Sequence, residues 1–178
     1  PKQKKLSSVN LTEIIEERKL TEINMVEYAE DFFISIGFEA LPDTFWERSL
    51  FVKPEDRSVV CHASAWNLNP ANNDLRIKMC IEKNEEDFIT IHHELGHIFY
   101  YQAYNHLPTL FQGGANDGFH EAFGDLLTLS ITPEYLKKIN FINQDEADRA
   151  EKDFIGLLMK QALEGVVVIP WALMLDKW

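Results

Sequence analysis

Two short histidine motifs constrain the fold more than any other feature of this sequence. Residues 92–97 read HHELGH and residues 120–125 read HEAFGD. Histidines four positions apart lie on one face of a helix, so His93 and His97 can reach the same cation if their segment is helical. A second helix would have to bring Glu121 to the same ion. The motifs therefore predict two helices that meet around one metal.

The types of residue in the two motifs match a catalytic zinc site. Such a site uses three protein ligands and keeps one position open, and His93, His97 and Glu121 would supply the three. Glu94 lies next to His93, where it can approach a zinc-bound water without binding the metal, as in the HExxH arrangement of zinc peptidases. Asp125 is one turn beyond Glu121 and could accept a hydrogen bond from the outer N–H of a liganding histidine.

This arrangement predicts a zinc peptidase. Zinc would lower the pKa of its bound water, and Glu94 would take the proton and pass it to the leaving amine. His92 and His120 point about 100° away from their neighbouring ligands on a helix, so we interpret them as packing or hydrogen-bonding residues. Two alternatives stay open: a non-catalytic zinc-binding or interaction module, and a zinc aminopeptidase or endopeptidase. An intact Glu94 argues against the first of these.

The rest of the sequence predicts a mostly α-helical fold with one short β-strand. The strand is expected in SVVCHASAW (58–66), before the turn NPANND. The last helix should begin near Gln144 and continue into the apolar C-terminal stretch, with a kink at Pro170. Other helices should start after polar caps, which are Thr21, Asn84, either Asn116 or Asp117, and Thr132 with Pro133 following it.

Charge and composition exclude several classes of function. The 178 residues carry a formal net charge of −12, which disfavours binding to nucleic acid or to an anionic membrane surface. No stretch reaches the ~18 apolar residues of a membrane-spanning helix, and no signal peptide stands at the start. The apolar C-terminal stretch lacks a helix stop signal, so we expect part of a larger domain. Cys61 and Cys80 could form a disulfide, although two buried free thiols are the simpler interpretation.

The motifs VVCHASAW, HHELGH, GANDGFHEAFGD and TPEYL, in this order and spacing, resemble the zinc peptidyl-dipeptidases related to angiotensin-converting enzyme. The resemblance extends over nearly the whole chain, and DLRIKMC and ANDGFHEA look closer to bacterial members. It implies a helical enzyme with a deep groove that removes dipeptides from the C-termini of peptides outside the cytoplasm, in an extracellular or periplasmic space. The 178 residues would be the central, zinc-bearing portion of the catalytic domain, without the downstream residues that bind the substrate carboxylate and stabilise the transition state.

The resemblance also implies roles for individual residues. Cys61 and Cys80 would form a disulfide, which reverses the preference for free thiols. A chloride ion is compatible with the family, but no residue of this segment identifies one, and neither the natural peptide nor the oligomeric state can be inferred. The implied roles are zinc binding by His93, His97 and Glu121, catalytic base for Glu94, a hydrogen bond from a zinc histidine to Asp125, binding of the substrate backbone by His62, Ala63 and Ala65, and an outer specificity pocket lined by Glu164, Val168 and Trp171.

Overall fold

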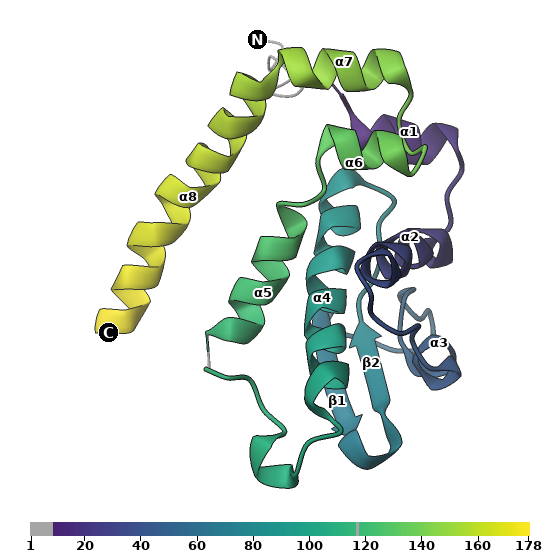
Figure 1. Ribbon diagram of the computed structural model, residues 1–178, viewed down its shortest axis with the longest axis vertical. Helices are drawn as coiled ribbons and strands as arrows, with labels where there is room; N and C mark the ends of the chain where they lie inside the picture. Colours follow the sequence, from purple (N-terminus) through teal and green to yellow (C-terminus); the bar gives the residue numbers. More distant parts are fainter. Residues whose placement is uncertain (1–8, 117) are drawn as a thin grey trace. The chain divides into compact units, whose positions relative to one another are not determined.

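The computed structural model describes residues 9–116 and 118–178, which fall into two compact units (Figure 1). The central unit is residues 11–131, and the C-terminal unit consists of residues 132–178 together with residues 9–10. Both are built mainly from helices, and a small antiparallel sheet lies in the central unit. The predicted fold class, mostly α with a short β element, is therefore confirmed.

The central unit contains five α-helices, two short 3-10 helices and two strands among its described residues. Their order along the chain is α1 (Leu11–Glu17), α2 (Glu22–Ser35), α3 (Asp43–Arg48), β1 (Ser64–Asn69), η1 (Pro70–Asn72), β2 (Asp74–Lys78), α4 (Glu85–Tyr104), η2 (Thr109–Phe111) and α5 (Phe119–Thr128).

Helix α4 is the structural centre of this unit, with α5 along one side and α2 along another (Figure 1). The sheet also contacts α4. The aromatic rings of Phe33 on α2 and Phe99 on α4 stack with their centroids 4.3 Å apart, and both side chains are fully buried. Apolar residues recur at helical spacing on the buried faces of α2 and α4, namely Met25, Val26, Ala29, Phe32, Phe88, Ile91, Leu95 and Ile98.

Polar caps set the starts of these helices, as the sequence predicts. The Asn84 side chain accepts a hydrogen bond from the Asp87 N–H at the start of α4, and Thr21 caps α2 in the same way. The expected cap of α5 is wrong: the cap position is Gly118, which offers no side chain. Asn116 instead accepts a hydrogen bond from the Gly118 N–H, which closes a turn ahead of the helix. Asp117, the other candidate, lies outside the described residues.

The predicted strand needs correction in both position and number. Residues 58–63 are not in a strand, and β1 begins at Ser64 and extends past the expected end. A partner strand, β2, was not predicted, although Leu75 and Ile77 alternate with polar residues and are fully buried. The strands pair antiparallel, and Asn73 adopts a left-handed conformation (φ 50°) in the turn between them.

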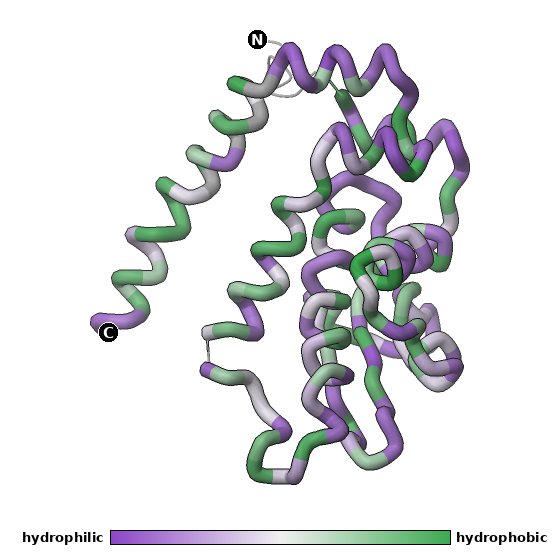
Figure 2. The backbone as a smooth tube through the Cα atoms, in the orientation of Figure 1, coloured by the Kyte–Doolittle hydropathy of each residue, from purple (hydrophilic) through white to green (hydrophobic). Residues whose placement is uncertain are grey.

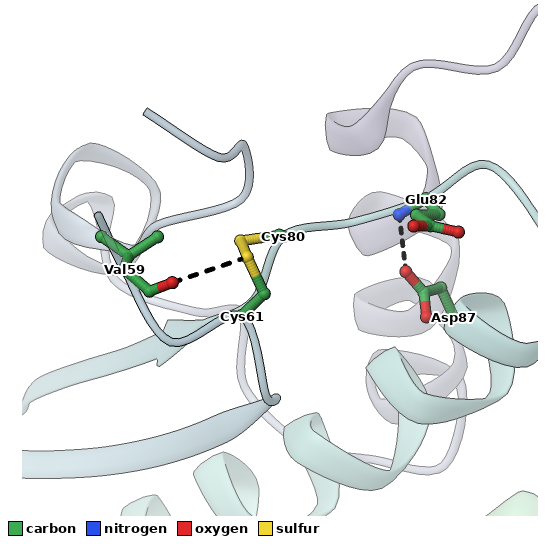
Figure 3. Close-up of a disulfide and its surroundings, with 5 residues drawn as sticks. All are labelled: Val59, Cys61, Cys80, Glu82 and Asp87. Carbon is green, nitrogen blue, oxygen red and sulfur yellow. Dashed lines mark hydrogen bonds between the residues drawn. A yellow bond between two sulfur atoms is a disulfide. The ribbon is translucent and has the colours of Figure 1, made fainter. Parts of the chain in front are cut away.

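A disulfide joins Cys61 to Cys80 and closes a loop around the two strands (Figure 3). The Cys61 sulfur also lies 4.0 Å from the Val59 carbonyl oxygen, a van der Waals contact because an oxidised sulfur carries no proton. A loop of this length stabilises the fold by about 3 kcal/mol through restriction of the unfolded chain. Just beyond, the Glu82 N–H donates to the Asp87 carboxylate, which fixes the entry into α4.

The C-terminal unit contains α6 (Pro133–Lys138), α7 (Gln144–Lys152) and α8 (Phe154–Lys177). Thr132 caps α6, and Pro133 occupies its first turn, as predicted. The single long helix expected from Gln144 is wrong, because Asp153 (φ −102°, ψ 24°) departs from helical geometry and separates α7 from α8. Pro170 lies inside α8.

Helix α8 is predominantly apolar, with a few hydrophilic residues along it and at its C-terminal end (Figure 2). Many of its large side chains are exposed, including Ile155, Val167, Ile169, Trp171 and Met174. Among the residues that the structure describes, no helix is both long and apolar enough to cross a lipid bilayer.

Replacing Phe33 with alanine should lower the free energy of unfolding by about 3–5 kcal/mol, because the change leaves a cavity against Phe99. Urea denaturation followed by circular dichroism measures this loss. The matched control is Ile34→Ala in the next position of α2, where the side chain is 41% exposed and the loss should be much smaller. Equal losses in the two variants would contradict the central role of the α2–α4 contact.

Candidate metal centre

The structure brings His93 and His97 of α4 together with Glu121 of α5. The Nε2 atoms of the two histidines lie 3.1 Å apart. One Glu121 oxygen lies 3.2 Å from His93 Nε2 and the other lies 3.6 Å from His97 Nε2. All the donor atoms are within 4.8 Å of one another, so one cation could contact the three side chains.

Asp125 lies behind His93, one turn along α5 from Glu121. Its carboxylate is 3.1 Å from His93 Nδ1. A hydrogen bond there holds the proton on Nδ1 and leaves the Nε2 lone pair directed toward the cluster. The carboxylate itself is largely exposed, so it stabilises the histidine orientation without the cost of a buried charge.

Glu94 is buried beside the cluster, although a carboxylate normally prefers water. Its Oε2 atom has no hydrogen-bond partner in the described part of the chain. Burial raises the pKa of this carboxyl and so does the charge of Glu121, whereas His93 and His62 lower it. A buried acceptor without a partner indicates a place for a polar ligand such as water.

His92, which precedes the candidate ligand His93, belongs to the core. His92 is completely buried, and its Nδ1 is 2.8 Å from the Phe88 carbonyl oxygen, to which it donates. Burial lowers the pKa of His92 to about 4, and the hydrogen bond to Phe88 offsets this only in part. The imidazole is therefore neutral at pH 7 and belongs to the core, in agreement with its interpretation as a packing residue.

Two glycines allow α4 and α5 to approach closely enough to form the cluster. A Cβ atom on Gly96 would lie 3.0 Å from Gly124 Cα, and one on Gly124 would lie 2.8 Å from the His93 ring. Any larger residue at either position would push the helices apart or displace the histidine. Motif spacing alone does not predict this role, although both glycines occur inside the two motifs.

His120, which the sequence predicts to be a packing or hydrogen-bonding residue, contacts the cluster through His97. His120 Nδ1 lies 3.3 Å from His97 Nδ1, and His120 Nε2 lies 2.9 Å from the Tyr104 hydroxyl. Burial lowers the pKa of His120, while the charge of Glu121 raises it. Tyr104 is seven residues after His97 and therefore shares its helix face, which is a sequence signal that could have identified it.

The residues expected to bind substrate are only partly associated with the cluster. His62 precedes β1, donates from Nδ1 to the Ala63 carbonyl oxygen at 2.8 Å, and influences the Glu94 carboxyl electrostatically. Ala65 lies in β1 opposite Ile77 of β2. The residues expected in an outer pocket belong to α8 in the C-terminal unit; Val168 and Trp171 are exposed, and the Glu164 side chain lies outside the described residues.

The cluster has the chemistry of a zinc site. Two imidazoles and one carboxylate form a borderline ligand set that suits Zn²⁺ and leaves an open position. The buried Glu94 oxygen without a partner, and the glycine that admits the His93 ring, show that the surroundings fit such an ion.

A family model described as peptidase M2, angiotensin-converting enzyme, matches residues 1–178. The chain belongs to this family. It is 44% identical over 172 residues to angiotensin-converting enzyme of Bos taurus. This match covers 96% of the chain and 13% of that relative. It is 43% identical over 165 residues to an angiotensin-converting enzyme-related protein of Drosophila melanogaster. This match covers 92% of the chain and 26% of that relative.

Another family member, angiotensin-converting enzyme of Theromyzon tessulatum, is 40% identical over 178 residues. This match covers 97% of the chain and 28% of that relative. The chain therefore spans between 13% and 28% of the length of these three family members.

Replacing Gly124 with alanine should weaken zinc binding by roughly tenfold or more, because the new Cβ would displace the His93 ring and its bond to Asp125. Alanine is the better helix former by ~1 kcal/mol, so poor helix formation cannot account for a loss. Competition with a chelating dye measures the affinity. Gly113→Ala, where a Cβ would meet nothing within 4 Å, is the control and should bind like wild type. Unchanged affinity in Gly124→Ala would contradict this role of the glycine.

Proposed function

We propose that this chain carries the catalytic zinc site of a peptidase that releases dipeptides from the C-termini of peptides in an extracellular or periplasmic space. The proposal rests on one observation above all: His93, His97 and Glu121 converge, and the buried Oε2 of Glu94 beside them has no hydrogen-bond partner among the described residues. Membership of the angiotensin-converting enzyme family supports the peptidase chemistry. The Cys61–Cys80 disulfide supports an oxidising compartment.

Glu94 would be the general base of the reaction. When bound by the two histidines and Glu121, zinc supplies Lewis-acid polarisation of the scissile carbonyl and makes water more acidic. Glu94 accepts the proton of the attacking water on its buried carboxylate and delivers it to the nitrogen of the leaving amine. Because burial raises the pKa of Glu94, its carboxylate is a stronger base toward the attacking water than an exposed carboxylate would be, and it can hold the proton until the leaving amine accepts it.

Strand β1 would hold the backbone of the substrate. Within the described residues β1 pairs with β2 on one edge only, and no strand covers the opposite edge. An extended peptide could add to that edge through backbone hydrogen bonds, and the small side chains of Ala63 and Ala65 would allow a close approach. His62, next to this edge and electrostatically coupled to Glu94, would lie near the scissile bond.

We further propose that these residues are a part of a larger catalytic domain. The exposed apolar side chains of α5 and α8, such as Phe119, Leu126, Ile169 and Trp171, support this, since extended apolar surfaces usually contact other protein. The remainder of the domain would supply the groups that bind the substrate carboxylate and steady the transition state. Activity is therefore best measured on the natural protein that contains this segment.

Elemental analysis after dialysis should find one zinc per chain, and the variant Glu121→Gln should hold it at least tenfold more weakly because it loses an anionic ligand. The control is Glu86→Gln, an exposed residue on α4 that should retain the wild-type zinc content. A folded wild-type chain without zinc would overturn the proposed site, and so would full retention of zinc by Glu121→Gln.

Replacing Glu94 with glutamine should leave zinc content unchanged and lower kcat by ~10²–10⁴, because the amide cannot accept the proton. The measurement uses a peptide blocked at its N-terminus, with products identified by mass spectrometry. Release of C-terminal dipeptides supports the proposal. Single N-terminal residues from an unblocked peptide would indicate an aminopeptidase, internal fragments an endopeptidase, and zinc binding without turnover a non-catalytic module.

A further inference from the structure

His120 occupies a site built from three tyrosines of α4. The centroid of its ring lies 4.5 Å from that of Tyr100, 4.7 Å from that of Tyr101 and 5.8 Å from that of Tyr104. The loop before α5 closes over the same ring, since a Cβ on Gly114 would lie 3.2 Å from His120 Cδ2. So many contacts around one imidazole restrict its orientation far more than a surface position would.

Hydrogen bonds connect this imidazole to the metal cluster in one consistent direction. His97 points Nε2 toward His93 and Glu121, so its proton must reside on Nδ1 if Nε2 is to bind a cation. His97 Nδ1–H can then donate to His120 Nδ1 at 3.3 Å. His120 keeps its own proton on Nε2 and donates it to the Tyr104 hydroxyl oxygen at 2.9 Å.

We propose that His120 is a positioning residue that fixes the tautomer and orientation of His97 through the hydrogen bond between their Nδ1 atoms, and that Tyr104 fixes His120 in turn. This inference rests on the zinc site of the proposed function. It gives each liganding histidine an outer partner: the Asp125 carboxylate for His93 and the His120 imidazole for His97.

The charge balance of the cluster explains why a neutral partner suits His97. Glu94, Glu121 and Asp125 already place three carboxylates around the two liganding histidines. The His97 side chain is only 11% exposed, less than that of His93 at 19%. A fourth carboxylate behind the more buried histidine would have to be desolvated among like charges, whereas a neutral imidazole accepts the same hydrogen bond without that cost.

The experiment compares zinc affinity, by chelator competition, in four variants of the natural protein. His120→Phe keeps an aromatic ring among the tyrosines but removes the acceptor, and should weaken zinc binding by ~10–100-fold. His120→Asn places an amide oxygen near the former Nδ1 and should recover most of that loss. Tyr104→Phe should show a smaller loss, and the control Tyr101→Phe, whose ring contacts His120 without a described hydrogen bond, should match wild type.

A spectroscopic measurement on the metal-free protein tests the same idea without activity. The ¹⁵N shifts of His97 should report a protonated Nδ1 in wild type and in His120→Asn, and a mixture of tautomers in His120→Phe. Wild-type affinity and tautomer in His120→Phe would overturn the inference. Equal losses in His120→Phe and His120→Asn would overturn it as well, since they would show that packing alone matters.

The Glu121→Gln variant separates this inference from the proposed function. If Glu121→Gln loses zinc while His120→Phe binds it like wild type, the metal site stands and the positioning role of His120 is wrong. If Glu121→Gln retains zinc fully, the proposed site is wrong, and the role of His120 falls with it.

Discussion

The close approach of α4 and α5 at Gly96 and Gly124 is the contact on which the rest of the site depends. With almost no space between the two backbones, the His93 ring fits directly against Gly124, and this brings its Nε2 within reach of Glu121. Helices usually pack 8–10 Å apart, at a distance set by the side chains between them. Here the absence of two side chains sets the distance. Helix packing therefore sets the geometry of the candidate metal ligands.

Helix α4 connects the core to the site because one of its faces packs against α2 and another packs against α5. One face carries Phe88, His92 and Phe99 into the contact with α2. Another face presents His93 and His97 to α5. Any rotation of the helix that moved a ligand would also move large buried side chains out of their packed positions. Because interiors are packed as densely as organic crystals, such a rotation is costly. The α2–α4 core thus holds the candidate ligands in place, although it lies outside the cluster.

The local features of this chain were predictable, and the features that depend on tertiary partners were not. The i, i+4 spacing of the motifs and the Asn84 cap are encoded within a few residues, so the ligand helix follows from them. The strand β2 was missed because DLRIK is short and charged, and only its partner β1 makes it a strand. The contacts of His120 were not predictable for a different reason. Helix geometry turns its side chain away from that of Glu121, and the three tyrosines that surround it lie on another helix, α4.

The buried carboxylate links metal binding to stability. Without a cation, Glu94 is partly desolvated beside the charge of Glu121, an arrangement that opposes folding. A divalent ion held by Glu121 and the histidines would turn this repulsion into attraction. A ligand that binds only the folded state stabilises it by RT ln(1 + [L]/Kd), about 4 kcal/mol at a free concentration a thousand times Kd. The carboxylates that are proposed to take part in the reaction would therefore also couple the stability of the fold to metal binding.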